Sequence, residues 1–122
     1  RPCKGTVGAM NASVVNIILE RSQGCCEAML LQSGCNGRGE HIHHRRLRSQ
    51  GGGDTATNCV HICHKCHDYI HRNTGDSYHR GLLCRSYWEP DAVPVEYRGI
   101  LVLLNPDGTY IKQCEGGFYA ER

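Results

Sequence analysis

The chain has 122 residues and a formal net charge of +2, so its length favours one domain and its charge favours no particular partner. It contains 15 Gly and nine Cys but only one Phe and one Trp, so the apolar core is thin and a disulfide or metal staple is expected. No stretch approaches the roughly 18 apolar residues that a membrane span needs.

Along the chain, residues 1–12 show no periodicity and predict a flexible lead-in to a single domain over 13–122. The apolar residues between 13 and 21 favour a short helix with Ser13 as its N-cap, and a buried strand is the alternative. Residues 22–38 mix glycines with cysteines and predict a metal knuckle rather than a regular element.

The centre of the chain predicts the order strand, loop, strand, helix. Strands are expected over 41–46 and 59–62, with a glycine-rich loop at 51–53 between them. Residues 64–73, directly after Cys63, favour a helix, on which His67 and His71 share a face because they are four residues apart. Residues 100–112 predict a hairpin with a turn at 105–108, within an extension of about 95–114. The expected fold class is α+β.

The cysteines favour a metal over a disulfide framework. Nine is an odd number, and Cys63 and Cys66 form a C-x-x-C pair in a run crowded with histidine. No secretory signal is visible, so we expect a reduced, cytoplasmic protein stapled by zinc. Cys59 is expected to be a small core residue. Cys3, Cys84 and Cys114 stay unassigned, and an oxidised pair between two of them remains an alternative.

The central histidines have the properties that hydrolysis of a phosphodiester requires. His43 and His44 are adjacent, so in a strand they point to opposite faces, and one can bind metal while the other faces substrate. His67 and His71 can bind one ion together. A neutral imidazole can take a proton from water, and a divalent cation can stabilise the charge that develops on the phosphate.

Three segments carry a resemblance to a known family: H-H-R at 43–45, Gly-Gly at 51–52, and NCVHICHKCHDYIH from Asn58 to His71. They resemble the HNH endonucleases, whose fold is the ββα-metal or His-Me finger. The likeness is greatest to the small phage and actinobacterial type with a four-cysteine structural zinc. It covers about residues 20–72, with a weaker likeness at 81–83 and in the C-terminal hairpin.

The resemblance implies roles for single residues. His44 would be the general base, and Asn58 would hydrogen-bond the backbone around it. His43, His67 and His71 would bind the catalytic cation (Mn, Mg, Ni or Zn), and three imidazoles suit Zn, Ni, Co or Mn better than Mg. The expected reaction cleaves DNA and leaves a 3′-hydroxyl and a 5′-phosphate.

The resemblance also implies a closed structural zinc site. Its ligands would be Cys26, Cys35, Cys63 and Cys66. Cys25 is the alternative to Cys26, which is favoured because Glu27 follows it as in the relatives that this sequence resembles.

The arginines of the centre suggest contact with a polyanion. Residues 38–72 carry an excess of positive charge, and the resemblance implies phosphate contacts by Arg45, Arg46 or Arg48. The alternative is a solvated, arginine-rich loop.

The expected partner is therefore DNA, with a homodimer or a phage terminase as further candidates and no membrane. The location expected from this reading is the cytoplasm of a bacterial host. A non-catalytic zinc module that binds DNA or a phage packaging partner is the alternative function, and it would need the four cysteines but not His44. A secreted, disulfide-rich protein is a third reading, which predicts no zinc and few free thiols.

Overall fold

The structure is a computed structural model, and it describes residues 10–113. The helices are α2 (Ala12–Ser22), α3 (His64–Arg72) and α4 (Thr74–His79), and the strands are β1 (His41–His44), β2 (Cys59–Ile62), β3 (Val95–Tyr97), β4 (Ile100–Leu104) and β5 (Tyr110–Lys112). The α+β expectation is confirmed as a mixture of helices and small antiparallel sheets.

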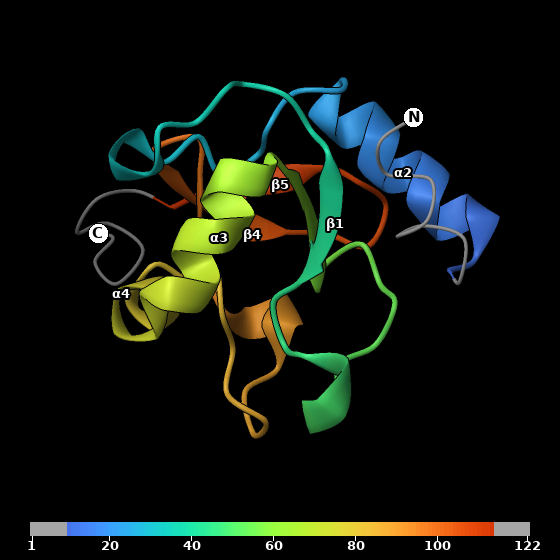
Figure 1. Cartoon of the computed structure of the whole chain (residues 1–122). Coiled ribbons are helices and arrows are strands. Elements are labelled where there is room, and N and C mark those ends of the chain that lie inside the picture. The colour runs from blue at the N-terminus through green and yellow to red at the C-terminus, as the bar shows by residue number, and fades with distance from the viewer. Residues whose placement is uncertain (1–9, 114–122) are drawn as a thin grey trace.

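A central hairpin separates α2 from α3. Strands β1 and β2 pair in antiparallel fashion, with His43 opposite Val60 and His44 opposite Cys59. In Figure 1, α2 lies on one side of β1 and α3 on the other, and the sheet β3-β4-β5 lies behind α3. The predicted strands and helix of the centre are therefore present, with β1 ending two residues earlier than expected.

The two faces of the hairpin belong to two hydrophobic clusters. On the α2 side, Ile42 and Cys59 pack with Val15 and Ile18. On the α3 side, Val60 and Ile62 pack with Ile70, together with the three-stranded sheet and the cysteines of the metal knuckle. Because side chains alternate along a strand, this division sends His41 and His43 toward α3, where both rings contact that of His67.

Helix α2 begins at a different residue from the one expected. Asn11, not Ser13, is the N-cap, and its side chain accepts a hydrogen bond from the Ser13 N–H. Asparagine is as good an N-cap as serine, because its side-chain oxygen accepts a hydrogen bond from a free N–H group of the first turn. The strand alternative for this segment is wrong. Residues 1–9 of the expected lead-in lie outside the described residues, and Met10 is already buried.

The C-terminal extension is larger than a hairpin. The expected pair is present as β4 and β5, but β3 adds a third strand, with Val95 opposite Val102. Helix α4, also not expected, begins directly after α3. No helix in the described part of the chain is long and apolar enough to cross a membrane.

Candidate functional site

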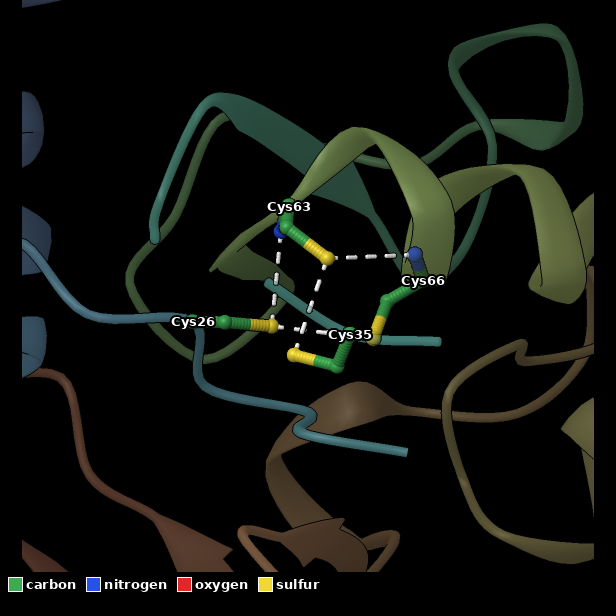
Figure 2. A group of neighbouring side chains, drawn as sticks. All are labelled: Cys26, Cys35, Cys63 and Cys66. Carbon is green, nitrogen blue, oxygen red and sulfur yellow. Dashed lines mark hydrogen bonds between the residues drawn. The ribbon is translucent and has the colours of Figure 1, made fainter. Parts of the chain in front are cut away.

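Four cysteines converge beside the first turn of α3. Cys63 is the N-cap of α3 and Cys66 lies in its first turn, while Cys26 and Cys35 come from the preceding knuckle. Figure 2 shows the four side chains pointing toward one another, and their sulfur atoms all lie within 4.8 Å. The Sγ–Sγ distances of Cys26–Cys66 and Cys63–Cys35 are both 3.7 Å. A tetrahedral zinc with Zn–S bonds of about 2.3 Å requires an edge of about 3.8 Å, so the group fits zinc.

Backbone N–H groups surround the sulfur atoms. Cys26 Sγ accepts from the N–H of Met29 and that of Cys63, each at 3.3 Å, and Cys66 Sγ accepts from the N–H of Leu30 at 3.4 Å. The hydrogen bond with Cys66, together with the backbone N–H groups of Met29 and Cys63, lowers the pKa of Cys26 to about 5. Burial raises the pKa of Cys35 to about 11. The four sulfur atoms are therefore not all ionised without a metal, and four thiolates at these distances would need a bound cation to offset their charge.

The residue after Cys26 holds the knuckle in place. The Glu27 carboxylate is fully buried and accepts two hydrogen bonds from Arg21, at 2.6 and 2.9 Å. It also accepts from the Tyr97 hydroxyl and from the backbone N–H of His61, both at 2.8 Å. Glu27 therefore ties the chain at Cys26 to α2, β2 and β3, which gives the Cys-Glu pair of the sequence a physical basis.

The choice between Cys25 and Cys26 is settled in favour of Cys26. Cys25 is exposed, and its sulfur is directed at the Gln23 carbonyl at 3.8 Å, away from the cluster. Cys59 is buried in the core, as expected, and Cys84 is buried as well. All seven described cysteines are free. Cys3 and Cys114 lie outside the described residues, so the alternative of an oxidised pair that includes them stays untested.

Three histidines form a second group that could hold a metal ion. His43 comes from β1, and His67 and His71 come from α3, one turn apart. One nitrogen from each lies within 4.8 Å of the others, and the Nε2 atoms of His67 and His71 are 3.2 Å apart. His43 is buried while His71 is exposed, so the group opens to solvent on the α3 side.

The protonation of these histidines suits a cation. Nε2 of His43 lies 2.8 Å from the Leu82 carbonyl oxygen, to which it donates, so the lone pair of His43 is on Nδ1. Burial lowers the pKa of His43 to about 3 and that of His67 to about 4. Both imidazoles are therefore neutral near pH 7, the form in which histidine binds metals.

His44 belongs to a different arrangement on the opposite face of β1. Its Nε2 lies 2.7 Å from Oδ1 of Asp54, and its side chain is 12% exposed. Arg48 contacts the same carboxylate oxygen at 3.1 Å. The hydrogen bond with His44, aided by Arg48, lowers the pKa of Asp54.

Asn58 connects the backbone on either side of this arrangement. Its Oδ1 accepts from the Arg46 N–H at 2.7 Å, and its Nδ2 donates to the carbonyl oxygens of Arg46 and Gly53, at 3.1 and 2.9 Å. We expected Asn58 to hydrogen-bond the backbone around His44, and the bonds it makes are to Arg46, two residues after His44. The same side chain also fixes the residue before Asp54.

The prediction that Arg45 contacts phosphate is wrong. Arg45 is fully buried, and its guanidinium donates to the carbonyl oxygens of Thr57, Gly81, Pro90 and Val93. Alternation along the strand places it on the inner face with His43. Arg46 is mostly covered and donates to the Trp88 carbonyl oxygen at 2.8 Å, whereas half of the Arg48 side chain is exposed. Arg48 is therefore the most accessible of the three arginines.

The sequence alone does not single out Asp54 or the Leu82 carbonyl. An aspartate after three glycines is an ordinary turn residue, and a backbone acceptor leaves no signature. In the sequence, only the position of Asp54, four residues before Asn58, could have indicated that it lies near the site. A scan against models of known families, a search of curated proteins and a search of solved structures each found no match.

Proposed function

We propose that the protein is a metal-dependent endonuclease of the HNH type that hydrolyses phosphodiester bonds of DNA. The observation that carries the proposal is that two consecutive residues of β1 belong to different polar arrangements. His43 belongs to the three-histidine group, and His44 pairs with Asp54. In this proposal His43 is a metal ligand and His44 is the proton acceptor, side by side at the end of one strand. The order β1, β2, α3 agrees with the ββα-metal motif that the sequence resembles.

The residues divide into separate tasks. The imidazoles of His43, His67 and His71 would hold one divalent cation, which would stabilise the charge on the attacked phosphate. His44 takes the proton of the attacking water through Nδ1, and Arg48 binds a neighbouring phosphate. Attack breaks the bond to the 3′ oxygen and leaves a 3′-hydroxyl and a 5′-phosphate.

The four-cysteine group has a structural task in this proposal. A closed set of four thiolates leaves no open position for substrate, whereas three histidines leave positions free. The free thiols suit the cytoplasm of a bacterial host, where DNA is the partner. Two groups of ligands thus imply two metal ions with different roles.

The test is metal-dependent nicking of supercoiled plasmid by wild-type protein and a His71→Ala variant. His71 is the exposed ligand, so its loss leaves the fold intact and weakens the cation site. We expect nicking with Mn, Ni, Co or Zn, and a metal requirement for the variant raised by about tenfold or more. His79→Ala, which removes an exposed histidine from α4, serves as the matched control and should behave as wild type. Equal metal requirements for all three proteins would contradict the assigned cation site.

A further inference from the structure

Asp54 lies in the loop that leads into β2, where Asn58 holds it close to His44. The Asn58 amide bonds the backbone at Arg46, two residues after His44, and at Gly53, just before Asp54. The backbone N–H of Asn58 also bonds both the carbonyl and the hydroxyl of Thr55. The distance between the end of β1 and the Asp54 loop is therefore set by a buried side chain, not by two flexible surface groups.

The hydrogen bonds around His44 select one tautomer of its ring. Nε2 lies 2.7 Å from the Asp54 carboxylate and 3.4 Å from Nε of Arg48. These two contacts are exclusive, because a nitrogen that donates its proton has no lone pair with which to accept another. A short bond to an ionised carboxylate is the stronger of the two. The proton therefore sits on Nε2, and the lone pair sits on Nδ1.

Nδ1 of His44 has no hydrogen-bond partner within residues 10–113. A neutral imidazole with its proton held on one nitrogen offers the other as a proton acceptor, which is the form that a general base requires. Arg48 also pairs with Oδ1 of Asp54 at 3.1 Å. This pairing keeps the carboxylate ionised and turned toward His44.

We propose that Asp54 is a positioning residue, which holds the His44 ring in the tautomer and orientation that leave Nδ1 free to take a proton from water. This inference rests on the proposed nuclease function for its consequence but not for its geometry. Asp54 is not a member of the three-histidine group. Its side chain contacts His44 and Arg48, and in this role it acts on the water through His44.

A plain surface ion pair is the competing interpretation of the same contacts. Such a pair would contribute little, and its loss would leave catalysis unchanged. The loss of a negative charge near bound DNA would then only strengthen DNA binding and lower KM. A positioning role instead lowers kcat without raising KM, because it removes an interaction needed in the transition state. The two interpretations therefore separate in the kinetic constants.

The experiment compares Asp54→Asn and Asp54→Glu with wild type in steady-state cleavage of plasmid DNA over a range of DNA concentrations, which gives kcat and KM separately. Asn can present an amide N–H to the ring and stabilise the wrong tautomer, so we expect kcat to fall by about tenfold to a hundredfold. Glu restores the charge on a longer arm and should recover part of that loss. Glu20→Gln removes one exposed acid from α2 and should match wild type.

A second readout does not depend on activity. Long-range ¹H–¹⁵N spectra at about pH 8, where an unperturbed imidazole is neutral, report which nitrogen of His44 carries the proton. We expect protonated Nε2 in wild type and a changed tautomer population in Asp54→Asn.

The two readouts separate failure of the inference from failure of the nuclease proposal. A wild-type His44 protonated on Nδ1, or an Asp54→Asn variant with unchanged kcat, would overturn the positioning role. A wild-type protein that cleaves nothing would overturn the nuclease function, and the spectra would still decide the tautomer.

Discussion

Gly52 lies where the backbone of the 51–53 loop presses against the end of β1. A Cβ at this position would stand 1.6 Å from the Arg46 carbonyl oxygen and 3.0 Å from Nδ2 of Asn58. Both atoms take part in the Asn58 hydrogen bonds that hold the backbone after His44 close to the backbone before Asp54. A methyl group here must therefore displace backbone, not a flexible side chain.

We expect Gly52→Ala to lower the free energy of unfolding by about 2–4 kcal/mol and to reduce nicking in the fraction that stays folded. Gly53→Ala is the matched control, because its Cβ would meet only the Thr55 methyl at an ordinary 3.7 Å. Urea unfolding of both variants checks the difference. Equal stabilities would contradict the close approach at Gly52.

At this scale the sequence predicts residue types better than it predicts their surroundings. The cysteine and histidine spacings correctly anticipate both groups of possible ligands. The role of Arg45 could not be anticipated, because its carbonyl acceptors lie in the loops at 57, 81, 90 and 93, far along the chain. In the sequence, an arginine next to a charged motif gives no sign of whether its side chain faces solvent or the interior.

At the scale of elements, α3 carries ligands of both groups, so the anchoring of its first turn matters. Glu40 accepts hydrogen bonds from the backbone N–H and the ring of His64, at 2.8 and 2.9 Å. These bonds, the backbone one foremost, lower the pKa of Glu40 from 4.5 to about 2. The carboxylate also lies at the positive end of the helix.

We expect Glu40→Gln to destabilise the protein by about 1 kcal/mol at neutral pH. The Glu40 pKa is depressed in the folded protein, so its stabilisation is complete above 4.5 and fades as pH falls toward 2. The difference in free energy of unfolding between wild type and variant should therefore become smaller as the pH falls from about 7 to about 3. Urea unfolding of both proteins at several pH values measures this difference, compared at the pH values where both proteins retain zinc. A gap that stays constant or widens in acid would refute the assignment.

The order of the central elements is predictable from the sequence, because the spacing of apolar residues and the glycines of the connecting loop are local features. The limits of β2 agree with the expected range, and α3 agrees to within a residue. Helix α4 and strand β3 are harder to predict. α4 has six residues and no side-chain cap, and β3 has three residues and depends on its pairing with β4. Strand β3 depends on its partner strand, and α4 depends on its packing against α3, so neither leaves a local pattern in the sequence.

At the scale of the whole molecule, the four-cysteine group lies where the knuckle, α3 and the sheet meet. Three of its cysteines belong to the larger hydrophobic cluster, which also contains Ile70, Val95 and Val102, and Cys35 packs against this cluster. We expect a domain with so few large apolar side chains to depend on a metal bound by this group, because metal-binding free energy becomes folding free energy.

We therefore expect Cys26→Ser to lose zinc and cooperative folding together. Cys25→Ser is the matched control, since the neighbouring thiol is exposed and points away from the cluster. Zinc content after dialysis and thermal unfolding check both variants. Loss of zinc in Cys25→Ser, or a fully folded Cys26→Ser without metal, would contradict the structural site.

The most direct test of the central claim is cleavage of supercoiled plasmid by wild type and by a His44→Ala variant that retains its zinc. We predict metal-dependent nicking by wild type and a loss of about a hundredfold or more in the variant, since a general base contributes on the order of 10²–10⁴-fold. Undiminished cleavage by the variant would contradict the role of His44. A wild-type protein that holds zinc and binds DNA, but does not cleave it whichever metal is added, would contradict the nuclease function. That result would favour a non-catalytic zinc module.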